Sequence, residues 1–248
     1  MILDKNIKII GKSLFLIKEK ILVISDLHVG YEQIFLKNGF FVPKIIKEEI
    51  KKDIFYILNK TKPNKILILG DLKHDFGRIN KNEKEEILEI LYLLKQNCKE
   101  IILIKGNHDN SLEYLIKKLK VIIKDFHIEK EYAFFHGNKI FKELFNKKIK
   151  FWIVGHNHPA ITIKKYVKKE KYKCFLIGKY KSKKVIILPS FFPLVEGVDI
   201  FENEDLNLDF KINKENFNIY AISDDNNLYD FGKLKNIKSI FSKSLYFE

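Results

Sequence analysis

The sequence predicts an α/β protein, and two observations support this fold class. Up to about residue 122, short apolar segments alternate with amphipathic segments of helical period, which is typical of a parallel, right-handed strand–helix arrangement. After residue 131, apolar segments follow one another with little helix between them, which predicts a second, more antiparallel sheet. The apolar segments are rich in Ile, Val, Leu and Phe without strict alternation, as strands are when both faces of their sheet are covered.

The individual elements follow from these patterns in chain order. The predicted strands span residues 20–25, 64–70, 100–106, 131–137, 150–156, 173–180, 183–189 and 216–223. Three helices are predicted from apolar residues that share one face: Ile46, Ile50, Ile54, Ile57 and Leu58; then Ile87, Ile90, Leu91, Leu94 and Cys98; then Leu112, Leu115, Ile116 and Leu119. Asn80 and Glu83 have the spacing of a capping pair at the start of the second helix.

Length and composition indicate one globular domain over residues 1–248, with a core at about 20–200 that carries the motifs. The tail at about 203–248 has no functional interpretation. No apolar run approaches the roughly 20 residues that cross a bilayer, and the first residues lack the apolar region of a signal peptide. We therefore expect a cytoplasmic protein with no membrane partner.

Charge and cysteine content narrow the function classes only a little. Cys98 and Cys174 are too few for a disulfide framework or a thiolate metal site, and Cys98 is interpreted as a small core residue. The net charge of +14 is typical of proteins that bind polyanions. However, nearly all of it comes from lysine, Arg78 being the one arginine, so a lysine-rich composition explains the charge equally well.

Side chains that can bind metals follow five of the predicted strands. Six of the seven histidines are among them, and only His127 lies elsewhere. The five groups are Asp26 and His28; Asp71, His74 and Asp75; Asn107, His108 and Asp109; His136; and His156 and His158. Since the carboxyl ends of neighbouring strands meet at one edge of an α/β sheet, these groups are expected to share one cleft.

The mixture of carboxylate and imidazole groups suits first-row divalent ions such as Mn, Fe, Ni or Zn. The candidate ligands are too many for one ion and fit two ions that share a bridging ligand. His156 and His158 could splay apart in their loop and reach different ions. For a single group, a hydrogen-bonded core histidine or a helix cap at Asp109 is an equally good explanation. Five groups at five strand ends favour a metal site.

The motif series "DLH … GD … GNHD … H … GHNH" resembles the calcineurin-like metallophosphoesterase superfamily in order and spacing over residues 20 to about 200. That resemblance implies a four-layer sandwich of two facing mixed β-sheets flanked by helices, with the site on loops at one rim. Together with "DLH.G", "GDLKH", "GNHD" and "GH.HP", a late "LPSFFPLVEGVD" segment (188–199) makes the chain similar to archaeal phosphoesterases related to the nuclease subunit of double-strand-break repair complexes. The chain is also similar to bacterial phosphoesterases associated with a DNA ligase.

The resemblance also implies roles for the residues of the motifs. Two divalent ions are expected, manganese first and iron, nickel or zinc as alternatives. Asp26, His28 and His158 would hold one ion, Asn107, His136 and His156 the other, and Asp71 would bridge them. Many members of the superfamily carry Asp or Asn where this chain has His74. We therefore expect His74 either to contact the substrate phosphate or to orient Asp71.

The expected chemistry is hydrolysis of a phosphate ester by a metal-activated hydroxide. His108 is next to a ligand but is not needed for coordination, so it is assigned as the general acid that protonates the leaving group. Asp109 could hydrogen-bond the imidazole of His108 and keep it protonated, and it could also cap the helix that follows.

The sequence restricts the identity of the substrate less than it restricts the type of reaction. Residues 164–184 hold ten lysines interleaved with Tyr166, Tyr172 and Tyr180. This lysine-rich segment could bind a nucleic-acid backbone, with the tyrosines stacking on bases. Alternatively it is a solvated β-hairpin whose tyrosines are half-buried. The leading hypothesis is a phosphodiesterase acting as a DNA or RNA nuclease. The alternatives are a phosphodiesterase for small cyclic or dinucleotide esters and a non-catalytic scaffold, which typically has lost ligands.

Overall fold

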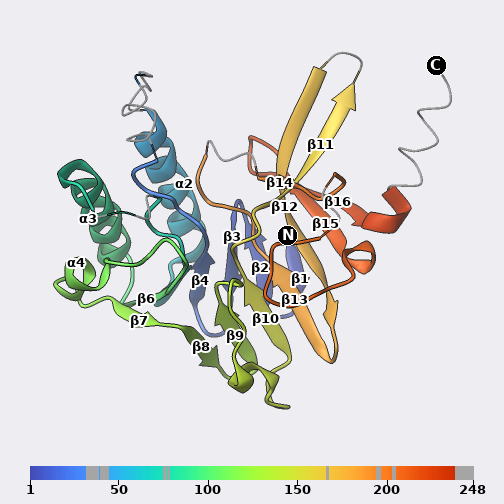
Figure 1. The fold of residues 1–248 in the computed structure, drawn as a ribbon, viewed down its shortest axis with the longest axis horizontal. Helices are drawn as coiled ribbons and strands as arrows, with labels where there is room; N and C mark the ends of the chain where they lie inside the picture. The colour runs from blue at the N-terminus through green and yellow to red at the C-terminus, as the bar shows by residue number, and fades with distance from the viewer. Residues whose placement is uncertain are drawn as a thin grey trace.

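Two β-sheets face each other in the computed structural model, and helices cover the outer face of the first sheet (Figure 1). The structure describes residues 1–31, 39, 45–74, 77, 79–165, 168–193, 197–202 and 205–237. Asp75, Arg78 and Tyr166 lie outside the described residues. Within these ranges, none of the helices combines the length and the hydropathy that a membrane span requires.

The first sheet has seven strands in the order of the chain. They are β1 (Ile2–Asp4), β2 (Ile7–Ile10), β3 (Ser13–Leu16), β4 (Ile21–Ile24), β5 (Lys65–Leu69), β6 (Glu100–Ile104) and β7 (Ile122–Lys124). Strands β1 to β4 form an antiparallel meander, and β4 to β7 are parallel. The parallel half is connected through α2 (Ile45–Thr61), α3 (Lys81–Gln96) and α4 (Glu113–Lys117).

The second sheet has the order β14-β11-β12-β13-β10-β9-β8, and β15 and β16 extend from β12. Its strands are β8 (Phe126–Glu129), β9 (Tyr132–Phe135), β10 (Phe151–Val154), β11 (Pro159–Lys165), β12 (Lys168–Tyr180), β13 (Lys183–Ile187), β14 (Val198–Asp199), β15 (Asn218–Ile222) and β16 (Leu228–Lys233). Strand β10 is parallel to both β9 and β13, so the sheet is mixed. The expected fold class is confirmed.

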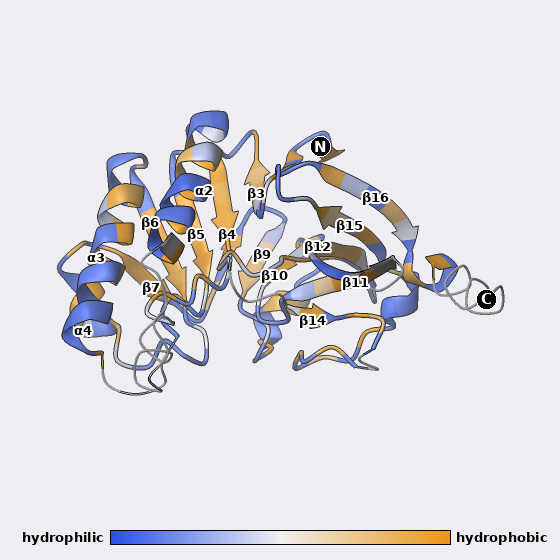
Figure 2. Ribbon diagram, turned by 90° about the horizontal axis from the view of Figure 1, so that it is seen from above, coloured by the Kyte–Doolittle hydropathy of each residue, from blue (hydrophilic) through white to orange (hydrophobic). Residues whose placement is uncertain are grey.

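The apolar strands of the first sheet lack strict alternation because each supplies two cores. In β4, Leu22 and Ile24 pack under the helices, while Ile21 and Val23 pack between the two sheets. β5 and β6 divide their residues in the same way, as the period of two along a strand requires. Figure 2 shows these hydrophobic strands next to the helices whose outer faces are hydrophilic.

A third core covers the outer face of the second sheet. It is built around Trp152, whose indole N–H donates to the carbonyl of Leu144 at 3.0 Å. The described residues that close this face belong to the short 3-10 turns η1 (Lys142–Phe145) and η2 (Lys214–Asn216), to the segments near them and to a helical turn at 234–237. Long helices therefore flank the first sheet, and short turns and irregular segments flank the second.

Several elements differ from the sequence-based expectation. Strands β1 to β3 were not predicted, and neither were β7, β8, β11, β14 and β16. The third helix is only the five-residue α4, although Leu112, Leu115 and Ile116 are buried as expected. Helix α3 ends at Gln96, so Cys98 is not on its apolar stripe; it is half-buried and packs against the helical core from the following loop. At the start of α3, Asn80 accepts from the Glu83 N–H at 2.9 Å.

Candidate dinuclear metal site

The loops after β4 and β10 bring one group of possible ligands together. The ligand atoms of Asp26, His28 and His158 lie within 4.8 Å of one another. His28 Nε2 and His158 Nε2 are 3.3 Å apart, and His158 Nε2 is 3.2 Å from Asp26 Oδ1. Two nitrogen ligands at about 2.1 Å from one ion and at right angles to each other would be ~3.0 Å apart, so this spacing fits a shared cation.

A second group is formed by the loops after β5, β9 and β10. The ligand atoms of Asp71, His136 and His156 also lie within 4.8 Å of one another. His156 Nδ1 is 3.0 Å from His136 Nε2, and Asn107 Oδ1 is 3.1 Å from the same Nε2. His156 and His158 therefore take part in different groups, as expected from the sequence.

The two groups adjoin each other. The His136 ring is 3.7 Å from Asp26 Oδ1 of the first group and 3.4 Å from Asp71 Oδ2 of the second. The backbone joins them too, since the His28 N–H donates to the Asp71 carbonyl at 2.9 Å. One rim of the molecule thus offers room for two neighbouring cations.

The backbone is strained where these side chains are attached. Asp26, His28, Asp71, His156 and His158 all have positive φ, between 45° and 67°. Such left-handed conformations are uncommon for residues other than glycine and cost on the order of 1–3 kcal/mol each. Five of them in one site indicate that the fold imposes these conformations to direct the side chains inward.

Two glycines allow the loops to approach closely. A Cβ on Gly106 would collide with the carboxylate of Asp71, and a Cβ on Gly155 would collide with the hydroxyl of Ser25. Both glycines have negative φ, so close approach rather than backbone conformation excludes a side chain there.

The polar atoms at the site fit bound cations. Asp26 Oδ2 accepts hydrogen bonds from the Ser25 hydroxyl and from the His156 N–H, the latter at 3.1 Å. Asp26 Oδ1 is fully buried, and no backbone group or hydroxyl of the described residues donates to it; the ring of His158, itself a proposed ligand, lies 3.2 Å away. An ionised oxygen in that position is costly unless a cation compensates it.

The ring of His136 is held in the way that protein ligands to metals usually are. Its Nδ1 donates to the Leu69 carbonyl at 2.7 Å, because a carbonyl can only accept. That bond leaves Nε2 to face His156 and Asn107. Metal-binding histidines commonly donate their second ring N–H to a carbonyl in this manner.

The protonation states also suit cations. Burial lowers the pKa of His28 to about 3 and that of His156 to about 4, so both rings are neutral near pH 7. Burial alone would raise the pKa of Asp26, but the charge and the hydrogen bond of His158 hold it well below its usual range. Burial alone would lower the pKa of His136, but the hydrogen bond with Asp71 and the charges of Asp26 and Asp71 raise it to about 9.

Cation binding is therefore expected to release a proton from His136. Below pH 9 the ring of the metal-free protein holds a proton that competes with the ion, so raising the pH favours binding. The apparent affinity should rise about tenfold per pH unit between pH 6.5 and 9 and level off above it, as one released proton requires. Calorimetric titration with Mn²⁺ in buffers of different ionisation enthalpy measures this proton. An affinity independent of pH over that interval would contradict the protonated state.

His108 and Asp109 lie beside the second group with different surroundings. His108 Nδ1 donates to the His74 carbonyl, its backbone N–H donates to Asp71 Oδ1 at 3.0 Å, and its Nε2 is 3.8 Å from Asp71 Oδ2. The carboxylate of Asp109 is buried and accepts from the backbone N–H groups of Gly106 and Leu72, each at 2.9 Å.

Two expectations for Asp109 are therefore wrong. Among the described residues its carboxylate bonds to backbone groups and not to the imidazole of His108. It does not cap α4 either, since the N-cap of that helix is Leu112 and no side chain caps it. Asp109 instead ties the Asn107 loop to the loop that follows Asp71. Burial, the largest cause, raises its pKa to about 6.

His74 is next to the Nδ1 edge of the His28 ring, whereas His158 faces its Nε2 edge. The two Nδ1 atoms are 3.3 Å apart, and the rings of His28, His74 and His108 form a third group that could hold a cation. Tyr31 packs edge-on against the His74 ring, with the centroids 4.2 Å apart. His74 thus contacts a proposed ligand of the first ion directly.

Sequence reasoning missed some residues of the site. Ser25 precedes Asp26 and bonds to its carboxylate. Asn207, from the tail without a functional interpretation, has its Nδ2 3.3 Å from His156 Nε2. A serine next to a motif aspartate could have been noticed, but nothing in the sequence places Asn207 near residue 156.

Some residues of the lysine-rich segment 164–184 are buried in the structure and others are exposed. Tyr180 packs on Trp152 and Phe210, with ring centroids 5.4 and 5.2 Å apart, so it belongs to the third core and is not a stacking platform. Lys183 is buried and donates to the carbonyls of Asn146 and Ile149, each at 2.7 Å. Among the side chains that the structure describes, the exposed lysines of the segment are Lys169, Lys171 and Lys179 on β12 and Lys181 in the turn that follows it.

The model of the calcineurin-like phosphoesterase family matches residues 19–225. No curated protein matches the chain. Among solved structures, a nuclease of Pseudomonas putida, MPE, superposes with a TM-score of 0.63 at 17% identity, covering 89% of this chain and 92% of that chain. At that identity the likeness shows the fold alone.

A further similar structure is the vacuolar protein sorting 29 protein of Cryptosporidium parvum. It has a TM-score of 0.42 and 14% identity, and the match covers 86% of this chain and 97% of that one.

Proposed function

The chain belongs to the calcineurin-like phosphoesterase family, and on this premise we propose that it hydrolyses phosphodiester bonds with two divalent cations. One observation carries the proposal: two groups of imidazole and carboxylate ligands adjoin each other at one rim of the fold. The proposed ligands are Asp26, His28 and His158 for one ion, Asn107, His136 and His156 for the other, and Asp71 between them. Manganese is the first choice of metal, with iron, nickel and zinc as alternatives.

A pair of divalent ions at this place supplies Lewis acidity, which lowers the pKa of water and neutralises charge on phosphate oxygens. The protein contributes ligands that are already oriented. The Ser25 hydroxyl fixes one oxygen of Asp26, and the Leu69 carbonyl fixes the ring of His136. Retention of every expected ligand favours an enzyme over a scaffold.

His108 is the proposed general acid. Its Nδ1–H donates to the His74 carbonyl, so Nε2 is the nitrogen that faces the leaving oxygen, and it can deliver a proton when the ring is in its doubly protonated form. The side chain is 14% exposed, which lets Nε2 reach a substrate in front of Asp71. We propose that Asp109 acts indirectly, by holding the loop that carries Asn107 and His108.

We further propose that the phosphodiester belongs to DNA or RNA. The net charge of +14 supports this choice, as does the resemblance of the late "LPSFFPLVEGVD" motif to phosphoesterases of DNA repair. A small cyclic or dinucleotide ester is the alternative. Binding of a polynucleotide weakens steeply with rising salt, whereas that of a small ester responds little.

The test is hydrolysis of bis(p-nitrophenyl) phosphate by the purified protein with Mn²⁺, Ni²⁺, Zn²⁺ or Mg²⁺ and with chelator. Metal-dependent turnover that chelator abolishes and metal restores is the expected result. Single- and double-stranded DNA and RNA then serve as substrates over a range of salt concentrations. Failure to hydrolyse the chromogenic diester with any of the metals would overturn the proposal.

A further inference from the structure

The far ends of β11 and β12 project from the second sheet as a two-stranded arm (Figure 1). Residues 162–165 and 168–171 pair only with each other among the described residues. Strand β12 joins the second sheet at Cys174, where its pairing with β15 begins. We call the paired residues 159–165 and 168–173 the arm.

The two faces of the arm differ in character. Ile161 and Ile163, with Tyr172 opposite Ile161, pack against the third core. Alternation along the strand places Lys169, Lys171 and Lys173 on the other face. Lys169 and Lys171 are exposed, so this face presents positive charge to solvent.

Lys173 anchors the base of the arm to the candidate metal site. Its ammonium group donates to the carbonyls of Ser190, at 2.9 Å, and Phe192. The Ser190 hydroxyl and the Phe192 N–H in turn donate to the Asp26 carbonyl, at 2.9 and 3.3 Å. The arm also begins one residue after His158. Its lysines therefore stand at a fixed position relative to the proposed ligands.

The spacing suits a substrate of several nucleotides. Lys171 is opposite Thr162, four residues from His158, and Lys169 is opposite residue 164, six residues away. At a rise of about 3.3 Å per residue these positions lie ~13 and ~20 Å along the arm. A duplex strand advances about 3.4 Å per nucleotide, so this distance corresponds to roughly four to six nucleotides. A dinucleotide does not reach from the metal site to both lysines.

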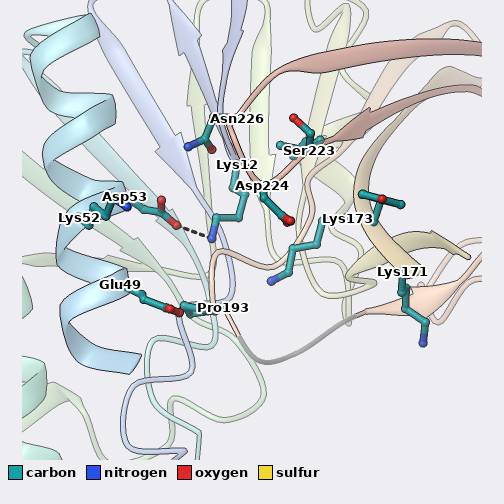
Figure 3. Close-up of a pocket in the computed structure, with 12 residues that line it drawn as sticks. Lys12, Glu49, Lys52, Asp53, Lys171, Lys173, Pro193, Ser223, Asp224 and Asn226 are labelled. Carbon is teal, nitrogen blue, oxygen red and sulfur yellow. Dashed lines mark ion pairs between the residues drawn. The ribbon is translucent and has the colours of Figure 1, made fainter. Parts of the chain in front are cut away.

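The base of the arm also borders a pocket of about 400 Å³ between α2 and β12, which Lys171 and Lys173 help to line (Figure 3). The carboxylates of Glu49, Asp53 and Asp224 line the same pocket. They offset the positive charge of the lysines there, so the interior of the pocket does not favour a polyanion. The exposed side of the arm is therefore the better anion-binding surface.

We propose that the exposed Lys169–Lys171 face of the arm binds the phosphodiester backbone of a polynucleotide several nucleotides from the bond held at the metal site. The proposal rests on the proposed function and names the length of substrate that the site uses. It predicts that the arm contributes to the binding of long substrates and not to the binding of short ones.

The test uses the double variant Lys169→Glu/Lys171→Glu. A matched control is Lys147→Glu/Lys148→Glu, two exposed lysines that precede β10 and so lie at the opposite end of that strand from His156. Fluorescence anisotropy measures the binding of 20-nucleotide single-stranded DNA, single-stranded RNA and duplex DNA to the metal-free proteins at several salt concentrations. Steady-state kinetics with Mn²⁺ compares a 20-mer, a dinucleotide and bis(p-nitrophenyl) phosphate.

For the arm variant we expect at least a tenfold weaker affinity for the preferred 20-mer and a higher KM for it. Two lost phosphate contacts should reduce the slope of log K against log salt by about 1.4 for a single strand. Kinetics on the dinucleotide and on the chromogenic diester should not change. The control variant should bind as the wild type does.

The proposal is overturned if the wild type does not bind the 20-mers, if the arm variant binds them as the wild type does, or if the control variant weakens binding equally. Because the chromogenic diester does not reach the arm, its hydrolysis reports on the metal site alone. The proposed function can therefore survive while the role of the arm fails. If both activities are absent, the proposed function itself is wrong.

Discussion

Replacing Asp71 with asparagine is expected to remove both cations and nearly all activity. The carboxylate is 2% exposed, and its two oxygens contact His108 and His136. An amide has the same shape but lacks the negative charge that holds two ions together. Loss of several kcal/mol of charge stabilisation in the transition state corresponds to a decrease in turnover on the order of 10³-fold or more.

Metal content per protein chain, measured by plasma mass spectrometry after dialysis, is the direct readout. Wild type loaded with Mn²⁺ should retain two ions, and the Asp71→Asn variant should retain close to none. Asp53→Asn is a suitable control, because Asp53 pairs with Lys12 away from the site and its loss should leave metal content unchanged. If Asp71→Asn still carried two ions, the bridging role would be wrong.

Replacing His108 with alanine is expected to slow turnover while both cations stay bound. A general acid typically contributes ~10²–10⁴-fold, and its contribution is greatest for a poor leaving group. Hydrolysis of a dinucleotide, which expels an alkoxide, should therefore fall by about that factor. Hydrolysis of bis(p-nitrophenyl) phosphate should fall much less, since p-nitrophenolate leaves without a proton.

The ratio of the two rates separates proton donation from a structural effect, which would lower both rates alike. His127→Ala is the matched control, because His127 is the one histidine outside the site and contacts Glu129 on β8. It should leave both rates unchanged. Full activity of His108→Ala on the dinucleotide would contradict the assignment of His108 as the general acid.

The strands that carry the site could be predicted because burial on both faces leaves a strong signal. β4, β5 and β6 are apolar over nearly their whole length, since one set of residues faces the helices and the other faces the second sheet. Helix α3 was equally clear from its apolar face and from Asn80 at its start. By contrast, β1 to β3 were missed because charged residues interrupt the apolar ones throughout the first twenty residues, which leaves only short apolar runs there.

Periodicity misled the prediction where tertiary packing overrides it. The apolar residues from Leu112 to Leu119 have helical spacing, but only Glu113–Lys117 is helical. The long strand β12 lies within the lysine-rich segment, and the charges of the segment hide the strand pattern. Part of the charge of the segment is buried in specific contacts, as for Lys183, and part is presented to solvent by the arm.

The sequence by itself determined which side chains stand at the ends of the strands and that imidazole and carboxylate groups predominate there. The chemistry of those groups is a local property, so divalent cations and phosphate esters could be inferred from it. Only the tertiary structure decided which groups meet. Asp26 and His158 are 132 positions apart, and their contact depends on the pairing of strands in two separate sheets and on left-handed backbone at both residues. The same holds for Asp109: its sequence neighbours suggest an imidazole or a helix as partner, but the folded loops supply backbone N–H groups instead.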